Sequence, residues 1–443
     1  MGSPQEHEAQ ARSILESLRE RGHRAYYAGG CVRDRVMGET PQDYDIATSA
    51  SPETVQEIFD ETVAVGARFG VIVVILEGNQ FEVATFRAEG RYLDGRRPEW
   101  VRFADEEADV LRRDFTCNGM LYDPIEDRLL DRVGGQEDIE QKLIRTIGDP
   151  EERFDEDRLR LLRAVRFAAR LGFRIDGPTA DAIRKLADRI ESVSWERIRD
   201  EVVKILTGPA ARRGFELMAD LGLLSPILPE VAALAGVQQP PQFHPEGDVF
   251  VHTMMLLELL ETRTKVVSLA GLLHDIGKPP TFSVTDRIRF NQHDSVGAKM
   301  ADAVCRRLRL SRQEREQIVD LVGSHMKFAA VKEMRESTLK RFLRKENFAD
   351  HVALHKADCL ASHGILDNAV FCESKIKEFE EKDREEALRP KALFDGHDLK
   401  GLGYKPGPLF REILSALEDA QLEGKLRTRE EALRWLADSY RVP

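Results

Sequence analysis

The sequence lacks any apolar run near the about 20 residues that a membrane-spanning helix needs, so we expect no transmembrane segment. Its N-terminus reads as a charged amphipathic helix without the apolar core of a signal peptide, which argues against secretion. Cysteine is scarce and scattered, since the five residues include no CxxC pair and their number is odd. This argues against a disulfide framework or a zinc–cysteine site and favours a reducing, cytoplasmic setting.

The chain also lacks an excess of basic residues, since its formal net charge is −12. That total does not favour nucleic-acid binding, but it is a weak objection because phosphate binding needs only a local basic surface. The sequence contains no internal repeat and no low-complexity segment. With 42% hydrophobic and 33% charged residues over 443 positions, it predicts a soluble protein of two to four globular domains.

Hydrophobic patterning divides the chain into a mixed α/β part and a helical part. The apolar runs 25–28 and 71–76 are strand-like, and 80–86 alternates with polar residues after a turn signal, which predicts a hairpin. From residue 151 the periodicity is helical, with no linker rich in proline, glycine or serine before it, and the clearest break is 236–245. The predicted domains are 1–150, 151–235, 236–385 and 386–443.

The strongest local signal is a Gly-Gly turn followed closely by two acidic residues. Gly29 and Gly30 follow a predicted strand, and such a turn lets backbone N–H groups approach a phosphate without a Cβ in the way. Arg33 adds a forked donor for the same charge. Asp43 and Asp45, as alternate residues of one strand, would place both carboxylates on one face, where they suit Mg²⁺.

A third carboxylate is available on a neighbouring strand. Glu82 lies in the second strand of the predicted hairpin, and we expect it to join Asp43 and Asp45. A lone DxD is more often a solvated turn, and a lone Gly-Gly pair is weaker still. Here both occur within seventeen residues, behind a strand and with an arginine between them. The combination favours a catalytic magnesium site that activates an attacking hydroxyl and stabilises a leaving pyrophosphate.

Six motifs of this part occur in the order of a known family: GGCVRD, DYDIAT, VGARFGVIVV, EVATFR, EGRYLDGRRP and RRDFTCNGM. With them the chain resembles the class II tRNA nucleotidyltransferase and poly(A) polymerase family, in its bacterial CCA-adding form. The resemblance implies an α+β fold, in which a polymerase β-type head with a small mixed sheet and helices precedes an all-α neck, body and tail. It also implies addition of CCA, or of its terminal A, to the 3′ end of tRNA from CTP and ATP with Mg²⁺, without a nucleic-acid template. Gly119 and Val110 replace the family's usual alanine and leucine conservatively.

The segment 156–166 matches the family's ED-x-x-R motif. We expect one helix here, with an apolar side and an arginine-rich side that by itself would be read as a solvated face. The resemblance implies instead that Asp157 and Arg160 read the Watson–Crick edge of the incoming base, because an acceptor beside a donor fork can match C or A after a small reorientation. By the same resemblance three arginines, each otherwise a surface ion pair, are candidate triphosphate contacts: Arg113, Arg163 and Arg166.

The stretch 89–98 resembles the family's flexible loop, with Asp94 and Arg97 at its polar centre. That loop is missing or altered in relatives that add only CC, so its presence implies that the terminal A can be added. The stretch 401–408 resembles the family's C-terminal region, and the likeness therefore covers nearly the whole chain.

A second set of potential ligands lies in the helical part, after an apolar run at 266–273. HDIGK at 274–278 resembles the HD phosphohydrolase domain that some bacterial tRNA nucleotidyltransferases carry. A lone histidine is more often a satisfied polar residue, but six potential ligands in the family's order favour a divalent transition metal such as Ni²⁺ or Mn²⁺. The predicted ligands are His252, His274, Asp275 and Asp358 for one ion, with His293 and His325 for a second.

Three other interpretations compete with CCA addition. A bacterial poly(A) polymerase shares the head motifs but usually carries a strongly basic tail, which is not found at the end of this sequence. An HD-domain phosphohydrolase with a vestigial head, or a binding-only module, would not need the intact Asp43/Asp45 and Asp157/Arg160 pairs. The expected partners are therefore the tRNA 3′ end, CTP and ATP, with no membrane and no obligate protein partner.

Overall fold

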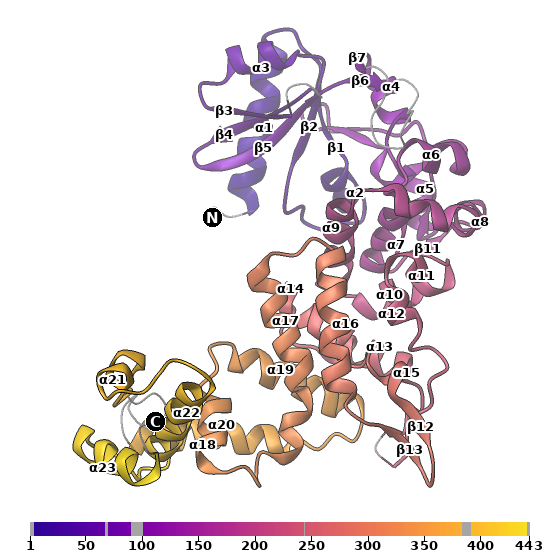
Figure 1. Ribbon diagram of the computed structural model, residues 1–443. Helices are drawn as coiled ribbons and strands as arrows, with labels where there is room; N and C mark the ends of the chain where they lie inside the picture. Colours follow the sequence, from indigo (N-terminus) through magenta and orange to yellow (C-terminus); the bar gives the residue numbers. More distant parts are fainter. Residues whose placement is uncertain (1–3, 67–69, 90–100, 243, 383–390, 441–443) are drawn as a thin grey trace. The chain divides into compact units, whose positions relative to one another are not determined.

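The computed structural model describes residues 4–66, 70–89, 101–242, 244–382 and 391–440. The chain divides into two compact units, Met1–Ala232 and Ala233–Pro443 (Figure 1). Within the described ranges, no helix is long and apolar enough to cross a membrane. The finer division into four domains remains a prediction.

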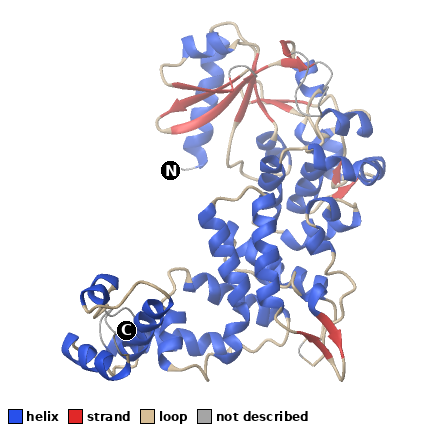
Figure 2. Cartoon of the chain, in the orientation of Figure 1, coloured by secondary structure: helices blue, strands red, loops and turns tan. Residues whose placement is uncertain are grey.

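The first unit contains a mixed sheet, whose strands are red in Figure 2. The sheet has seven strands in the order β3-β4-β5-β2-β1-β8-β9. β1 pairs antiparallel with β2, and β2 pairs in parallel with β5, so the strands that carry the predicted acidic residues are neighbours. The first helix, α1, buries its apolar stripe and packs against β1 and β2. The bounds are α1 (Pro4–Glu20), β1 (Ala25–Ala28), β2 (Asp45–Thr48), β3 (Thr62–Gly66), β4 (Val71–Leu76), β5 (Asn79–Thr85), β8 (Leu121–Asp123) and β9 (Arg128–Leu130).

The predicted hairpin is confirmed as β4 and β5. The two strands pair antiparallel from Val71 opposite Ala84 to Leu76 opposite Asn79. Their two-residue turn places Glu77 at φ 51° and Gly78 at φ 83°, and two positive φ angles match the turn type whose twist suits a tight hairpin.

Short elements and helices complete the first unit. They are α2 (Gly30–Val36), α3 (Pro52–Ile58), β6 (Arg87–Glu89), β7 (Val101–Phe103), α4 (Glu106–Leu111), η2 (Thr116–Asn118), α5 (Gly135–Glu140), β10 (Leu143–Ile144), α6 (Pro150–Glu156), α7 (Arg160–Leu171), β11 (Arg174–Ile175), α8 (Gly177–Leu186), η3 (Ala187–Ser192), α9 (Trp195–Leu206), α10 (Ala211–Asp220), α11 (Leu224–Ile227) and α12 (Pro229–Ala232).

The single helix expected over 156–166 is wrong, because α6 ends at Glu156 and α7 begins at Arg160. Asp157 has an extended backbone, with φ −141° and ψ 100°. Its Oδ1 accepts a hydrogen bond from Leu159 N at 3.1 Å, a local side-chain contact that competes with helix formation. The apolar side of α7 is buried as expected, at Leu161, Val165, Ala168 and Ala169.

The second unit is helical apart from one hairpin, β12–β13, in the part that the structure describes (Figure 2). The fold class inferred from the motifs is therefore confirmed, with small two-stranded pairs added to the helical region. Its elements are α13 (Val249–Leu259), α14 (Lys265–Leu273), α15 (Lys278–Thr281), β12 (Phe282–Val284), β13 (Ile288–Phe290), α16 (His293–Arg307), α17 (Arg312–Ser324), η4 (His325–Ala330), α18 (Glu336–Leu343), α19 (Phe348–Ala361), α20 (Asp367–Lys382), α21 (Gly396–Gly401), α22 (Pro408–Leu422) and α23 (Arg429–Ser439).

Candidate functional site

The Gly-Gly turn joins β1 to α2 in the first unit. Gly29 has φ +73° and ψ −128°, a left-handed backbone conformation that favours glycine. A Cβ at this position would lie 3.5 Å from both Arg113 Nη1 and Asp45 Oδ2. The glycine therefore brings the backbone close to one predicted carboxylate and one predicted phosphate-binding arginine.

Two of the three predicted head carboxylates come from neighbouring strands. β2 and β5 pair in parallel with Ile46 opposite Val83, so Asp45 and Glu82, one residue earlier on each strand, lie side by side. Asp43 lies in the bend before β2, so the expectation that both aspartates belong to one strand is not met. All three carboxylates belong to exposed residues, on or beside two interior strands of the sheet.

These carboxylates interact electrostatically. The pKa of Asp45 is raised to about 6, first by partial loss of hydration and then by the charge of Glu82, while Arg113 opposes the shift and Asp43 adds to it. The ligand atoms of the three carboxylates do not all lie within 4.8 Å of one another, although all three belong to the described residues. A divalent cation would relieve their repulsion and prefers such hard oxygen ligands, so the donor set fits one.

A pocket of about 590 Å³ includes Asp45 in its wall. Eight predicted residues line it: Gly29, Gly30, Arg33, Asp45, Arg113, Asp157, Arg160 and Arg163. Eight further residues complete it: Arg87, Arg112, Asp114, Asn118, Leu159, Phe167, Arg170 and Arg197. With eight arginines and three carboxylates, the wall is basic although the whole chain is acidic. It supplies the local basic surface that phosphate binding needs.

Two of these arginines, Arg33 and Arg163, are joined by a hydrogen-bonded network through Asn118 and Asp114. The sequence analysis assigned no role to Asn118 or Asp114. Arg33 Nη1 donates to Asn118 Oδ1 at 2.8 Å, and Asn118 Nδ2 donates to Asp114 Oδ1 at 3.5 Å. Arg163 Nε donates to Asp114 Oδ2 at 2.7 Å. Burial alone would raise the pKa of Asp114, but the charge and hydrogen bond of Arg163 hold it below its ordinary value. Both missed residues belong to the motif RRDFTCNGM, which was the available signal.

Asp109, like Asp114, is a carboxylate to which the sequence analysis assigned no role. It pairs with two arginines of the pocket. It is buried on α4 and pairs with Arg112 Nη2 at 2.5 Å and with Arg113 Nη2 at 2.9 Å. Burial would raise its pKa, but the two guanidinium charges lower it. An ionised carboxylate therefore fixes Arg113 beside the Gly-Gly turn.

Phe167, on α7, lies beside three arginines that were predicted to contact phosphate. The guanidinium carbons of Arg33, Arg163 and Arg166 lie 5.7, 5.4 and 4.2 Å from its ring centroid, within the range of cation–π attraction. Arg166, however, donates from Nε to buried Glu201 at 2.6 Å and is not among the residues that line the pocket. The structure thus brings Arg163, but not Arg166, to the place where a triphosphate contact was predicted.

Asp157, which is predicted to read the base, is held by a residue from another helix. Its Oδ2 accepts from Arg197 Nη2 at 2.8 Å, and its Oδ1 accepts from Leu159 N at 3.1 Å. Arg197 lies on α9 and also lines the pocket. No sequence signal links positions forty residues apart, so only the folded chain reveals this pair.

Arg160 is nearly buried, and its guanidinium faces backbone and acid acceptors. Nη1 donates to Arg153 O at 2.9 Å and to Glu156 Oε2 at 2.6 Å, and Nη2 donates to Arg112 O at 3.0 Å. Asp157 and Arg160 line the same pocket, but the contacts found within the described residues do not pair them with each other. Arg160 is buried, so the solvated face that was the alternative does not describe this residue.

Asp94 and Arg97, at the centre of the predicted flexible loop, lie outside the described residues. The same holds for 67–69 in the motif VGARFGVIVV.

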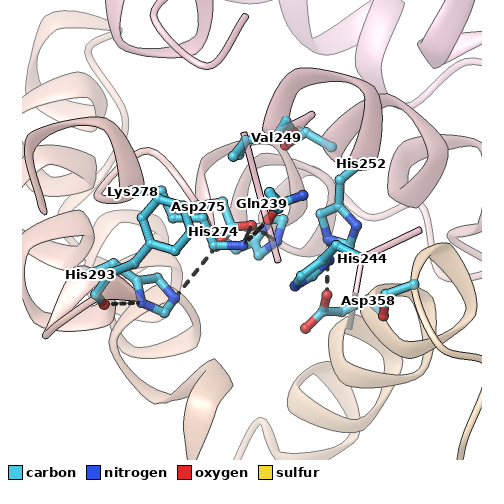
Figure 3. A network of polar contacts seen from close by, with 12 residues as sticks. Gln239, His244, Val249, His252, His274, Asp275, Lys278, His293 and Asp358 are labelled. Atoms are coloured by element: carbon cyan, nitrogen blue, oxygen red, sulfur yellow. Dashed lines mark hydrogen bonds and ion pairs between the residues drawn. The ribbon is translucent and has the colours of Figure 1, made fainter. Parts of the chain in front are cut away.

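In the second unit, Asp275 lies between two groups of histidines (Figure 3). Its Oδ2 is 3.1 Å from His274 Nε2, and its Oδ1 is 3.5 Å from His293 Nε2 and 3.9 Å from His325 Nε2. Ligand atoms lie within 4.8 Å of one another in each of two groups that share Asp275: one with His252 and His274, the other with His293 and His325. A carboxylate common to both groups suits a site for one ion or for two bridged ions.

Asp358 lies next to the first group through its contact with His252. His252 Nε2 lies 3.0 Å from Asp358 Oδ1, and all six predicted ligands are thus brought together. Burial would lower the pKa of His252, but its contacts with Asp358 and Glu246 raise it to about 9. Two carboxylates against four imidazoles form a donor set that fits a divalent transition metal.

Three of these histidines share one local geometry. In each, Nδ1 lies at hydrogen-bond distance from the backbone carbonyl three residues earlier, and a carbonyl can only accept, so Nδ1 carries the proton and Nε2 presents its lone pair inward. The pairs are His274 with Gly271 at 2.8 Å, His293 with Phe290 at 3.0 Å and His325 with Val322 at 2.7 Å. Burial, and then the charge of His274, lower the pKa of His325 to about 4, which keeps that ring neutral. Metal-ligating histidines are oriented in this way.

The glycine of HDIGK allows the two groups to approach each other. A Cβ at Gly277 would lie 2.0 Å from His293 O and 2.6 Å from Gly297 N, so a larger residue would push α16 away. Close packing at this glycine brings His293 to Asp275, and this is the physical reason for the residue in the motif.

A larger pocket, of about 1210 Å³, opens on this centre and is lined by Asp275, His293, His325 and Asp358 among others. Lys278 and His244 also line it, and sequence reasoning assigned neither. Lys278 Nζ lies 2.6 Å from Asp275 Oδ2, which brings a basic group to the shared carboxylate. Basic side chains around a His/Asp centre suit an anionic substrate.

Three family models match the chain in this order. The Poly A polymerase head domain matches 25–145, the probable RNA- and SrmB-binding site of polymerase A matches 172–234, and the HD domain matches 248–360. The chain therefore contains, in this order, regions that match a polymerase head, a probable RNA-binding site and an HD domain, and the resemblance inferred from the motifs is confirmed. Head and HD domains of these kinds typically use divalent metals, in agreement with the two donor sets.

Several proteins similar to this chain are CCA-adding enzymes. The chain is 45% identical over 225 residues to that of Geobacillus kaustophilus and 46% identical over 209 residues to that of Bacillus subtilis, matches that cover 51% and 47% of this chain and 55% and 52% of those proteins. The chain thus spans about half the length of the curated relatives it matches. The crystal structure of the Bacillus stearothermophilus CCA-adding enzyme in complex with CTP has TM-score 0.72 and 28% identity over 99% of this chain and 98% of that chain. A Thermotoga maritima CCA-adding enzyme complexed with tRNA, at 19% identity over 98% of this chain and 95% of that one and TM-score 0.57, shares the fold.

Proposed function

We propose that the chain adds CCA, or its terminal A, to the 3′ end of tRNA from CTP and ATP, with release of pyrophosphate. The observation that carries the proposal is the arginine-lined pocket, because it combines the Gly-Gly turn, Asp45 and the pair Asp157 and Arg160 in one wall. Similarity to CCA-adding enzymes, one of them solved with CTP, supports it. A tRNA substrate agrees with the cytoplasmic location expected from the sequence.

Asp43, Asp45 and Glu82 would hold Mg²⁺ near the start of β2. The ion would supply charge neutralisation at the triphosphate and a lower pKa for the attacking hydroxyl. The chain's own task is to orient the triphosphate, through the backbone at Gly29–Gly30 and through arginines fixed by Asp109, Asp114 and Phe167. The phosphate contacts proposed here are Arg33, Arg113 and Arg163; the role predicted for Arg166 would require it to leave Glu201.

Base selection would come from Asp157 and Arg160 without a nucleic-acid template. As the structure stands, Asp157 is engaged by Arg197, and Arg160 by Glu156 and two backbone carbonyls. Reading a base edge therefore means exchanging some of these protein contacts for contacts with the base. Asp157 and Arg160 are held by different groups, so the acceptor and the donor fork can change their relative orientation. Matching C first and A later requires such a change.

Incubation with two tRNA substrates tests the proposal. One lacks CCA and the other ends in CC, and each is given CTP and ATP separately and together, with sequencing of the products. Addition of C, C and A in that order supports full CCA addition, and addition of A to the CC substrate alone supports A-only addition. Long A tracts on either RNA would identify a poly(A) polymerase instead, and no addition with Mg²⁺ present would contradict a catalytic head.

Replacing Asp157 or Arg160 by alanine should relax the choice of nucleotide more than it weakens triphosphate binding. Loss of a base-edge contact removes about 1–3 kcal/mol of discrimination, which is about 5- to 150-fold in relative incorporation. The measurement is incorporation of UTP and GTP relative to CTP and ATP. Arg184→Ala, which removes an exposed arginine paired with Asp181 on α8, is the control. An unchanged preference in both test variants would leave the two residues with a structural role only.

For the second unit we propose a divalent-metal site with phosphatase or cyclic phosphodiesterase activity. The specific observation is the gathering of His252, His274, Asp275, His293 and His325 into two groups that share one carboxylate. Ni²⁺ or Mn²⁺ suits the imidazole-rich donor set, and a bound ion would supply an activated water and polarise a phosphoryl oxygen. The pocket that opens on the centre is large enough for more than a phosphate group.

A further inference from the structure

His252 differs from the other three histidines of the metal centre in what faces its Nδ1. The others have a backbone carbonyl three residues earlier in the chain. At His252, the Nδ1 atom lies 2.7 Å from Glu246 Oε1, and the imidazole itself is fully buried. Its Nε2 points the other way, to the predicted ligand Asp358 at 3.0 Å. A carboxylate thus takes, at His252, the place that a carbonyl takes at the other histidines.

Glu246 is itself fixed by a closed loop before α13. Gln239 N donates to Gly247 O at 2.9 Å and Val249 N donates to Val237 O at 3.0 Å, so the loop is tied together at its base. Within it, His244 Nδ1 lies 2.9 Å from Glu246 Oε1, the oxygen that also faces His252. The His244 ring stands edge-on to the His252 ring, with centroids 4.9 Å apart (Figure 3).

The same loop reaches the shared carboxylate by a second route. Gln239 Nε2 donates to Glu246 Oε1 at 3.5 Å, and Gln239 Oε1 accepts from Lys278 Nζ at 2.6 Å. Lys278 Nζ in turn lies 2.6 Å from Asp275 Oδ2. Glu246 is therefore linked to two predicted ligands, directly to His252 and through two side chains to Asp275.

We propose that Glu246 is a positioning residue of the metal centre in the second unit: it fixes the tautomer and orientation of His252, so that Nε2 faces the ion. The inference rests on the proposed metal site. The carboxylate charge 2.7 Å from Nδ1 favours a proton on that nitrogen rather than on Nε2, although the two atoms are not aligned for a hydrogen bond in this structure. The negative charge also makes the imidazole a stronger donor to a cation than a carbonyl would. His244 and Gln239 hold Glu246 in place through their contacts with its Oε1 atom.

Removal of such an outer carboxylate typically lowers metal affinity about 10- to 100-fold, and that is the loss expected for Glu246→Ala. Glu246→Gln keeps an acceptor oxygen of the same shape without the charge, so it should lose less affinity than Glu246→Ala. The matched control is Glu316→Ala, because Glu316 forms an exposed pair with Arg312 on α17 and should bind metal as the unmutated protein does.

The test uses full-length protein stripped of metal. Calorimetric titration with Mn²⁺ and Ni²⁺ gives affinity and stoichiometry for each variant, and the visible spectrum of the Co²⁺-loaded protein reports the ligand geometry. Thermal unfolding without metal shows whether each variant is folded. If Glu246→Ala does not fold, Glu246→Gln and His244→Ala are compared in its place, because both leave an oxygen beside His252 Nδ1.

We expect weaker binding and a changed Co²⁺ spectrum in Glu246→Ala, with the control unchanged. Equal affinity and an identical spectrum in the unmutated protein and the Glu246 variants would overturn the role of Glu246 alone. If the unmutated protein binds none of the three ions, the proposed metal site is contradicted and the inference falls with it. A lower melting temperature without a change in affinity or spectrum would assign Glu246 to stability and also overturn the proposal.

Discussion

Replacing Asp43 or Asp45 by alanine is expected to abolish nucleotide addition while leaving the fold intact. Asp45 opens β2 beside Glu82, and its pKa of about 6 results from lost hydration and from neighbouring negative charge. Such a carboxylate is costly to keep without a cation, so removing it should leave stability unchanged or slightly higher. Loss of a metal ligand should raise the barrier by several kcal/mol, hence orders of magnitude in rate, at about 1.4 kcal/mol per tenfold.

Single-turnover incorporation of CTP and ATP into tRNA, at saturating nucleotide and Mg²⁺, measures this effect. The control is Asp60→Ala, which removes an exposed aspartate before β3 in the same unit. Thermal unfolding of each variant separates loss of catalysis from loss of fold. Near-normal incorporation by either the Asp43 or the Asp45 variant would show that the assignment of metal ligands in the head is wrong.

Joint replacement of His274 and Asp275 by alanine should remove the transition metal and any phosphohydrolase activity from the second unit. Asp275 is shared by both ligand groups, so its loss affects every ion that the centre could hold. Nucleotide addition should be mostly unchanged, because the head offers a separate set of carboxylate ligands in the first unit. Two different donor sets are expected to support two separable activities.

The double variant leaves Lys278 buried without its nearest carboxylate, which is destabilising. Asp275→Asn, of nearly the same volume, is therefore measured beside it. The assay is elemental analysis of the purified protein before and after substitution, with hydrolysis of phosphomonoesters and cyclic phosphodiesters. If the unmutated protein holds no transition metal even after incubation with Ni²⁺ or Mn²⁺, the histidine cluster is a structural remnant.

Much of the head was predictable because its signals are local in the chain. A hairpin needs only alternation and a turn, and the pairing of β4 with β5 follows from both. Gly29 is required by a left-handed backbone that lies next to Asp45, and the motif order was enough to place them together. The six predicted ligands of the second unit also followed from residue type and order, and the structure brings all six residues together.

The predictions that failed concern segments where a local side-chain contact or a distant partner decides the outcome. Helical periodicity ran through 156–166, but the Asp157 side chain caps the amide of Leu159 and ends the helix there. Arg166 and Arg163 lie on the same helix face and were predicted to play the same role. The guanidinium of Arg166, however, donates a hydrogen bond to buried Glu201 on α9. Periodicity records which face a residue occupies, but it cannot record which charge from another helix will meet it.

The sequence by itself determined which chemical groups this protein carries: carboxylates after a Gly-Gly turn, an acceptor and a donor fork at Asp157 and Arg160, and imidazoles with carboxylates in the second unit. Residue type and short spacing are enough for that, since they depend on the chain's covalent order. Only the tertiary structure decided which groups hold these residues, such as Asp109 and Asp114 behind the arginines, Arg197 on Asp157 and Glu246 behind His252. The physical reason is that burying a charge without a partner costs free energy, so each buried charge is paired. The partner is whichever group the fold brings within hydrogen-bond distance.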